Sequence, residues 1–268
     1  MFLINSYRFA TQQLWTPAEI TTALWLDADD ASTVTTVSGA VSQWNDKSGN
    51  GRNASQSVHS SRPLFTTNSQ NGKNGITFDG LNDYLVFSSA LLANTHSLFI
   101  LFKPTIESAI GTVFGQWSAG EFGRYLWNVN QTDTGATIPG RLNVFNNTST
   151  QGSGHDGLTG SVAIENEATM IASISALGTE QWKILKNGTE RESATIARVF
   201  TGVNSSLGSL NAGTSSSPYD GVIYEVILLL SYASIDIYRR IEGYLAHKWG
   251  IAGSLPSDHP YKSAAPTA

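Results

Sequence analysis

Only one stretch of this chain, Ser234 to Gly250 (SIDIYRRIEGYLAHKWG), has apolar residues at helical spacing, and the segments before it are typical of strands and turns. Its apolar side chains recur three or four residues apart and form one stripe of a helix: Ile235, Tyr238, Ile241, Leu245 and Trp249. Ser234 is an N-cap residue, and Gly250 can end the helix in a left-handed conformation. An isolated helix of this length is marginal in water, so it must lie on an apolar surface.

That surface should be a β-sheet, because the rest of the chain predicts many short strands joined by polar turns. Charged residues make up only 14%, against about 25% in ordinary domains, and there are 25 glycines. Ser97 to Lys103 (SLFILFK) is a continuous apolar run, typical of a central strand covered on both faces. Asn187-Gly188 predicts a tight hairpin turn. We expect an all-β, two-sheet antiparallel sandwich with one C-terminal α-helix, whose Ile241, Leu245 and Trp249 close the sandwich edge.

Gly243 lies in the middle of the predicted helix, where glycine costs about 1 kcal/mol relative to alanine. We therefore expect it to mark a close contact between the helix and the sheet.

Composition excludes several classes of function. The net charge is −5 and the 16 basic residues are scattered, which argues against nucleic acid as a partner. With no cysteine there is neither a disulfide framework nor a thiolate metal site. The five histidines lie far apart, so a zinc site is not expected. We expect no membrane span and no standard signal peptide, since the apolar runs are too short for either.

Three segments are expected along the chain. Residues 1–17 form an N-terminal arm, residues 18–253 form the sandwich with its helix at 234–249, and residues 254–268 form an extended, proline-containing strap. The arm is either an edge strand or frayed end, or an anchor that buries its apolar side chains on a partner. The anchoring residues would be Phe2, Leu3, Ile4, Tyr7 and Phe9.

Three stretches together carry a family resemblance: Trp25 to Gln56, Asn74 to Leu85, and Tyr219 to Lys262. They resemble the concanavalin A-like, laminin G-like jelly-roll domains of bacterial surface proteins and of tailed-bacteriophage virion proteins. The resemblance spans roughly residues 17–262. It implies a curved jelly roll of two antiparallel sheets, used for glycan binding, adhesion or assembly contacts. The opening MFLINSYRF also resembles the start of phage structural proteins that attach through their first residues.

No catalytic residue is expected. A glycoside hydrolase would need two carboxylates converging across a groove. Glu165 and Glu167 lie on one face of a strand but lack a third acidic residue at alternate spacing, and a solvated strand face or loop explains them better.

A cofactor is not expected, with calcium as the one alternative, because related folds use loop-bound cations. Asp46, Asp79 and Asp83 would be its ligands. Aspartates in glycine-rich turns more often serve backbone geometry, and that interpretation is favoured.

The best candidate for sugar binding is the glycine-rich loop at residues 115–125, which carries Trp117, Phe122, Arg124 and Tyr125. These would supply an aromatic platform and polar groups. The alternative places Trp117 in the core, where tryptophan in a strand-rich protein is more often found.

The first interpretation of function is a non-enzymatic virion surface protein of a tailed phage, acting as head decoration, head fibre or tail adhesin. Its partners would be other virion proteins, further copies of itself and host-surface glycans. It would assemble in the host cytoplasm and reside on the virion surface. The alternatives are a secreted carbohydrate-active enzyme and a bacterial lectin-like adhesin on the same fold.

Overall fold

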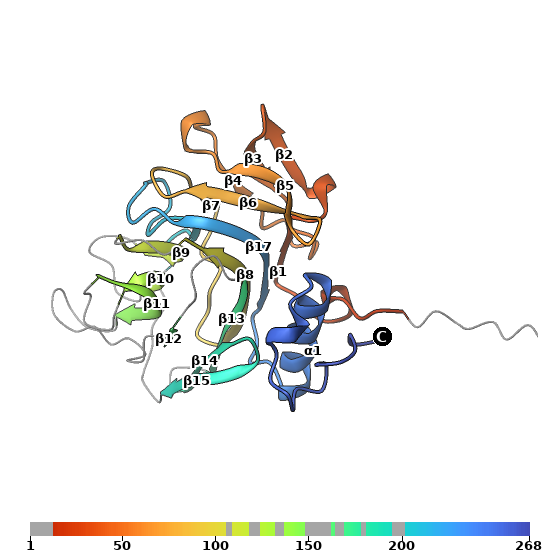
Figure 1. Cartoon of the computed structure of the whole chain (residues 1–268). Helices are drawn as coiled ribbons and strands as arrows, with labels where there is room; N and C mark the ends of the chain where they lie inside the picture. Colours follow the sequence, from red (N-terminus) through yellow and green to blue (C-terminus); the bar gives the residue numbers. More distant parts are fainter. Residues whose placement is uncertain are drawn as a thin grey trace, which may run out of the picture.

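The long apolar runs of the sequence become the central strands of an antiparallel β-sandwich in the computed structural model of the protein (Figure 1). The structure describes residues 13–105, 109–117, 124–131, 137–147, 162–163, 169–177, 181–194 and 202–268. The predicted all-β, two-sheet sandwich with a single C-terminal helix is confirmed.

One sheet is organised around the last strand of the chain. Its order is β15–β14–β13–β8–β17, and β17 then pairs with β6 along its first half and with β1 along its second, while β5 lies beyond β6. The strands are β1 (Leu24–Asp27), β5 (Leu64–Gln70), β6 (Lys73–Asp79), β8 (His96–Pro104), β13 (Met170–Leu177), β14 (Gln181–Lys186), β15 (Thr189–Ala194) and β17 (Asp220–Leu229).

The second sheet has the order β2–β3–β4–β7–β16–β9–β10–β11–β12. Its strands are β2 (Val34–Val37), β3 (Ala40–Trp44), β4 (Ala54–Ser55), β7 (Leu85–Phe87), β9 (Gly111–Gln116), β10 (Arg124–Gln131), β11 (Thr137–Asn147), β12 (Val162–Ala163) and β16 (Ser206–Leu207). A pairing of Ala40 with Leu64 links the two sheets at one corner.

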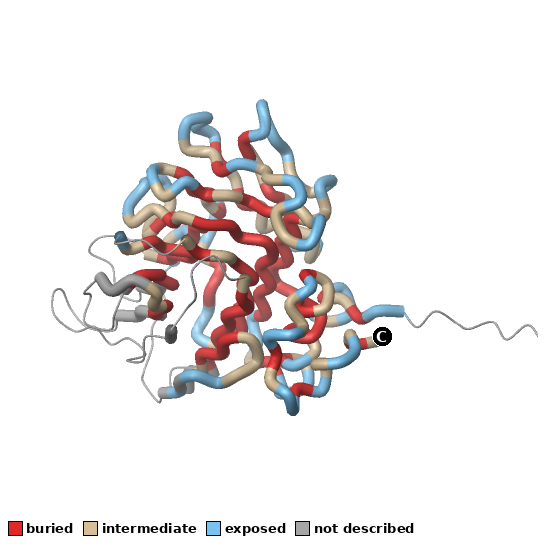
Figure 2. The backbone as a smooth tube through the Cα atoms, viewed as in Figure 1, coloured by how far each residue is buried: buried red, intermediate tan, exposed pale blue. Residues whose placement is uncertain are grey.

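The central strands β8 and β17 are buried on both faces, as the unbroken apolar runs predicted (Figure 2). Along β8, Ile100 and Phe102 point into the core between the sheets. Their neighbours Phe99 and Leu101 belong to a second core on the outer face of the same sheet. The apolar side chains of the helix cover that outer core.

The helix α1 (Ile235–Lys248) starts where the sequence predicts, and the Ser234 hydroxyl accepts a hydrogen bond from Ile237 N at 3.3 Å. Gly250 follows with φ of 70°. Ile241, Leu245 and Trp249 are fully buried, which confirms their packing role. Their place differs from expectation: they cover the outer face of the first sheet and not the sandwich edge, because that face carries its own apolar residues.

Gly243 also makes a different contact from the one expected. A Cβ at this position would meet Cβ and Cγ of Tyr261 at 2.6 and 2.7 Å. The close approach is therefore to the segment after the helix and not to the sheet. The same segment also contacts the helix through His259 with Glu242 and through the carbonyl oxygen of Tyr261 with His247.

The hairpin turn is as predicted, with Asn187 at φ 50° and Gly188 at φ 79°. Short 3₁₀ turns occupy Pro17–Glu19, Ala31–Thr33, His59–Ser61 and Ala252–Ser254. The segment 255–268 makes hydrogen-bonded turns and then pairs with the start of the described chain, through a bridge between Leu14 and Thr267.

Residues 1–12, which include the predicted anchoring side chains Phe2, Leu3, Ile4, Tyr7 and Phe9, lie outside the described residues, so the arm stays a prediction. None of the helices among the described residues is long and apolar enough to cross a bilayer.

Candidate functional site

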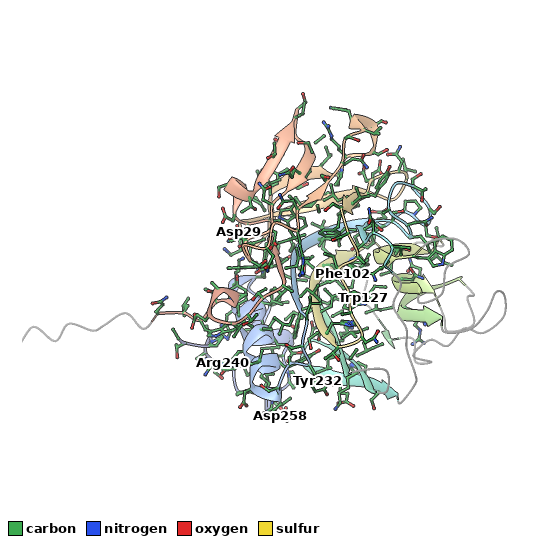
Figure 3. The ribbon with its side chains drawn as sticks, turned by 180° about the vertical axis from the view of Figure 1, so that it is seen from behind. Asp29, Phe102, Trp127, Tyr232, Arg240 and Asp258 are labelled. Carbon is green, nitrogen blue, oxygen red and sulfur yellow. The ribbon has the colours of Figure 1, made fainter. Side chains whose placement is uncertain are left out.

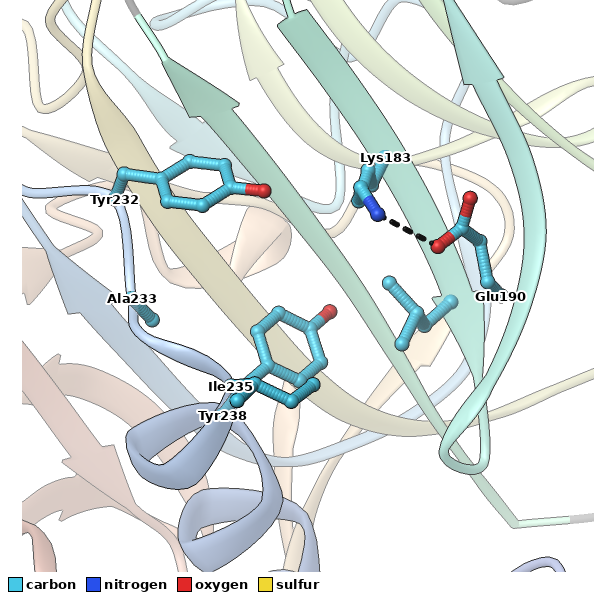
Figure 4. A pocket seen from close by; sticks show the side chains of 7 residues that line it. Lys183, Glu190, Tyr232, Ala233, Ile235 and Tyr238 are labelled. Carbon is cyan, nitrogen blue, oxygen red and sulfur yellow. Dashed lines mark hydrogen bonds and ion pairs between the residues drawn. The ribbon is translucent and has the colours of Figure 1, made fainter.

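A pocket of about 170 Å³ lies at the N-terminal end of α1, between this helix and the β14–β15 hairpin (Figure 4). We call it the tyrosine pocket. Tyr232 and Tyr238 line it on the helix side, and the ion pair of Lys183 with Glu190 lines it on the hairpin side. Apolar atoms of Leu185, Ala233 and Ile235 complete the walls.

Local sequence explains how these side chains meet. The tight Asn187-Gly188 turn folds β15 back on β14 and brings Glu190 opposite Leu185, close to Lys183. On the other side, β17 ends at Leu229 and the helix starts after Ser234, so Tyr232 stands in the short connection. Tyr238 follows in the first turn of the helix. The pocket is thus built from the β14–β15 hairpin, the helix α1 and the link between β17 and α1.

The ion pair in the pocket is exposed, with Lys183 Nζ 2.8 Å from Glu190 Oε2. The side chains are 41% and 44% accessible. An ion pair this exposed contributes at most about 1 kcal/mol to stability. The hydrogen bond to Glu190 raises the pKa of Lys183, so the ammonium stays charged at neutral pH.

The two tyrosines differ in what holds them. Tyr238 is buried; its hydroxyl donates to Ser173 Oγ, and its ring centroid lies 4.6 Å from that of Phe99. Burial raises the pKa of Tyr238 well above its usual value. Tyr232 is half-buried, and no described residue hydrogen-bonds its hydroxyl. Its ring reaches across the pocket towards Lys183 (Figure 4).

At the other end of α1 a second polar cluster surrounds Glu225, a fully buried residue of β17. Oε1 accepts from Trp25 Nε1 at 2.7 Å and from the Tyr244 hydroxyl at 2.9 Å. Oε2 accepts from Lys248 Nζ at 2.8 Å and from Trp249 Nε1 at 2.7 Å. We call this group the Glu225 cluster. Figure 3 shows the two regions, with Asp29 beyond one end of the helix and Tyr232 near the other.

Asp27 completes the Glu225 cluster, since its carboxylate accepts from Lys248 at 2.6 Å and from Lys47 at 2.8 Å. Burial would lower the pKa of Lys248, but the carboxylates of Glu225 and Asp27 raise it above its usual value. Burial raises the pKa of Glu225. Every carboxylate oxygen of Glu225 already has two donors, so this cluster fixes the helix to the sheet and leaves no acceptor for a ligand.

A larger pocket of about 470 Å³ lies beside the Glu225 cluster, between the two paired chain ends. Its basic groups are engaged by the protein: Lys248 by the cluster, Lys73 by Asp29 at 2.7 Å, and His247 by the carbonyl oxygen of Tyr261 at 2.7 Å. The hydroxyl of its tyrosine, Tyr244, donates to Glu225, whereas the Tyr232 hydroxyl in the tyrosine pocket has no hydrogen-bond partner among the described residues.

The predicted sugar-binding loop is only partly covered. Trp117 follows β9 and is half-buried. Arg124 and Tyr125 open β10, in register with Asn147 and Asn146. Their side chains, and Phe122 as a whole, lie outside the described residues, so this loop stays a prediction.

The predicted calcium ligands lie in two different loops. The Asp46 carboxylate accepts from the backbone N–H groups of Trp25, Ser48 and Arg52 and from the Ser48 hydroxyl. Asp79 and Asp83 share the turn after β6, where Asp79 Oδ1 accepts from Leu81 N at 2.9 Å and Asp83 Oδ2 from Asp79 N at 3.1 Å.

Burial, and then the charge of Asp79, raise the pKa of Asp83 to about 6. Among the described residues, no three His, Asp or Glu side chains group to hold a metal ion. Backbone geometry accounts for the contacts that these aspartates make, and calcium stays an untested alternative.

Glu165 and Glu167, the carboxylates weighed for hydrolysis, lie outside the described residues. The sequence interpretation missed the tyrosine pocket. One signal could have found part of it, because the predicted Asn187-Gly188 turn already places Lys183 and Glu190 across one hairpin. A second signal concerned the Glu225 cluster, since Glu225 is the one charge within the apolar run from Val222 to Leu230.

Comparison with known proteins supports the fold. No family model matches the sequence, and no curated protein matches it. The binding domain of botulinum neurotoxin serotype D has a similar structure, with a TM-score of 0.55 and 10% identity over 83% of this chain and 50% of that chain.

Two arabinan-related structures are also similar. Domain 4 of AbnA, a GH43 extracellular arabinanase from Geobacillus stearothermophilus in complex with arabinotriose, has a TM-score of 0.54 and 14% identity over 80% of this chain and 94% of that one. An arabinofuranosidase complexed with arabinofuranosyl-alpha-1,2-xylobiose has a TM-score of 0.55 and 16% identity, covering 76% of this chain and 50% of that chain.

This chain spans about half the length of two of these three structures. At identities this low, the likeness establishes the fold, a concanavalin A-like jelly-roll sandwich.

Proposed function

We propose that this chain is a non-enzymatic carbohydrate-binding module, displayed on the surface of a tailed-phage virion, and that the tyrosine pocket holds the sugar. The observation that carries the proposal is the half-buried ring of Tyr232, whose hydroxyl has no hydrogen-bond partner among the described residues, beside the exposed Lys183–Glu190 pair. Sugar sites combine an aromatic surface for the apolar face of a ring with a few polar groups for its hydroxyls.

Solved structures of the same fold support carbohydrate as the ligand class. One similar domain was solved in complex with arabinotriose, and the botulinum neurotoxin serotype D binding domain was also solved in complex with N-acetylneuraminic acid.

The non-enzymatic part of the proposal rests on the state of the acidic groups. A hydrolase needs one carboxylate that is free to protonate a leaving group and a second that faces it across the substrate. Glu225 is enclosed by four donors, and Glu190 is paired with Lys183 on the surface. Neither arrangement offers an open acid and base across a groove.

The virion part of the proposal rests on the sequence resemblance to phage structural proteins and on the apolar arm before Pro17. In this view the arm attaches the module to a capsid or tail protein, and several copies sit on the particle. The module would then present its sugar pocket to the host surface.

Glycan-array binding of the purified protein and of its Tyr232→Ala variant tests the sugar site. We expect the wild type to bind a defined set of glycans and Tyr232→Ala to lose at least about tenfold in affinity, since removing an aromatic platform costs more than 1 kcal/mol. Leu81→Ala is the matched control, because Leu81 is 73% exposed in the turn after β6 and outside the pocket.

Trp117→Ala in the same experiment separates this pocket from the loop predicted by sequence. If Trp117→Ala loses binding and Tyr232→Ala binds fully, the sugar site lies in the loop at residues 115–125 and not in the tyrosine pocket. A wild type that binds no glycan would refute the proposed function.

Immunogold labelling of purified particles tests the virion assignment. We expect label on every particle and its loss when residues 1–12 are deleted. Particles without label, in a lysate that contains the free protein, would contradict the assignment.

A further inference from the structure

The charges that line the tyrosine pocket cancel. Lys183 and Glu190 are its charged side chains, and the hydrogen bond to Glu190 keeps Lys183 protonated. The other lining residues are two tyrosines and three apolar side chains. A ligand that carries a net charge would therefore find no uncompensated opposite charge in this pocket.

The pocket offers a ligand both hydrogen-bond donors and hydrogen-bond acceptors. The Lys183 ammonium has three N–H groups and donates one to Glu190 Oε2. Glu190 Oε1 is left as an acceptor on the same side. The Tyr232 hydroxyl, which can donate and accept, stands across the space (Figure 4). A donor and an acceptor held next to each other match two neighbouring hydroxyl groups, because a hydroxyl can act in both ways.

The apolar surface and the size of the pocket limit what else can bind. Ile235 is 59% exposed and its side chain lies beside the buried ring of Tyr238, across the pocket from Tyr232, and Leu185 adds a further apolar wall (Figure 4). A volume of about 170 Å³ is smaller than the sites that enclose drug-sized ligands, which start near 300 Å³. The pocket has room for one sugar ring, so the remaining sugars of a longer glycan would lie outside it.

We infer that the tyrosine pocket takes the terminal, uncharged hexose of a glycan, with one face of the ring on Tyr232 and two adjacent hydroxyls shared between Lys183 and Glu190. This inference rests on the proposed function and narrows its ligand. A terminal sugar acid is disfavoured, because Glu190 already neutralises Lys183 and its carboxylate would repel the carboxylate of the sugar.

The test is calorimetric titration with two matched glycans, one ending in a neutral hexose and the other carrying a terminal sialic acid on the same core. We expect the wild type to prefer the neutral end. Glu190→Gln and Lys183→Met should each weaken the neutral ligand about tenfold, the cost of one hydrogen bond to a charged group. Glu190→Gln should at the same time strengthen binding of the sialylated ligand.

Lys73→Met is the control, because it removes another lysine–carboxylate pair, the half-buried one with Asp29, at the opposite end of the helix. It should leave both affinities unchanged. Circular dichroism checks that each variant is folded, and the exposure of both pocket residues makes folding defects small.

The outcomes separate the two proposals. A preference for the sialylated glycan that Glu190→Gln does not increase would overturn the neutral-sugar inference and leave sugar binding in place. If the variants Tyr232→Ala, Lys183→Met and Glu190→Gln all bind the neutral glycan as the wild type does, the sugar site lies outside this pocket. No binding of either glycan would overturn the neutral-sugar inference, and a wild type that also binds nothing on the glycan array would overturn the proposed function.

Discussion

The two ends of α1 meet the same sheet, yet their polar groups are in opposite states. At the C-terminal end, Glu225 is inaccessible and both of its oxygens are shared by two indoles, a tyrosine and a lysine. At the N-terminal end, Glu190 and Lys183 have one partner each and the Tyr232 hydroxyl has none among the described residues. Both ends combine tyrosine, lysine and glutamate, so residue type does not separate an anchor from a binding site. The number of partners and the access of solvent do.

The largest effect we expect is at the anchored end. Glu225→Gln would place an amide N–H₂ group against N–H donors and leave Lys248 with a weaker partner, and breaking a buried pair in this way costs about 3–5 kcal/mol. The free energy of unfolding, measured by urea denaturation, should fall by that amount. Glu190→Gln is the same chemical change at the open end and should stay within about 0.5 kcal/mol of wild type. Equal losses in the two variants would remove the distinction.

A smaller effect should appear between the two ends, at Gly243. Helix propensity alone predicts that Gly243→Ala stabilises the protein by about 1 kcal/mol. The new Cβ would meet Tyr261 at 2.6 Å, and overpacking of this kind costs about 1–3 kcal/mol, so we expect a net loss. A double-mutant cycle with Tyr261→Ala should recover much of it. If Gly243→Ala alone stabilises the protein, the segment that carries Tyr261 can shift away from the new Cβ at little cost.

The smallest effect should come from Asp83, a buried carboxylate that has one donor and a like charge nearby. Its pKa is raised to about 6, so its contribution to stability is present below about pH 4 and is lost as the pH rises through 6. Asp83→Asn should therefore stabilise the protein more near pH 8 than near pH 4, because the wild-type carboxylate is charged only at the higher pH. Thermal unfolding across this pH range is the measurement. A calcium-dependent rise in Tm in the wild type that Asp83→Asn abolishes would instead favour the cation alternative.

Much of the fold was predictable because periodicity and burial are coupled. The stripe that includes Ile241 and Leu245 identified the helix, and the unbroken run from Ser97 to Lys103 identified a strand buried on both faces. The sequence could not show what the helix covers, since an edge and an outer face both supply apolar neighbours. Gly243 was recognised as a close contact, but its partner Tyr261 lies in a segment without periodicity.

The candidate site was harder to predict because it depends on which side-chain donors and acceptors have no hydrogen-bond partner in the folded protein. Lys183 and Glu190 could be placed on one hairpin from the Asn187-Gly188 turn. That Tyr232 would face them depends on how the link from β17 to α1 crosses the sheet, and no local pattern encodes that. Trp117 was predicted as a sugar platform because it is an aromatic residue in a glycine-rich loop. The composition of a loop does not show which residues its side chains contact.

The place of β17 in the sheet has a consequence for the order in which the molecule can be made. This strand is near the end of the chain, but it lies between β8 on one side and β1 with β6 on the other. The hydrogen bond from Trp25 to Glu225 joins residues 200 positions apart. At about 5–20 residues per second, a ribosome spends roughly 10–40 s between the first strand and its partner. During that time the backbone edges of β1 and β8 that pair with β17 have no hydrogen-bonding partner, and unpaired strand edges of this kind favour aggregation until β17 emerges.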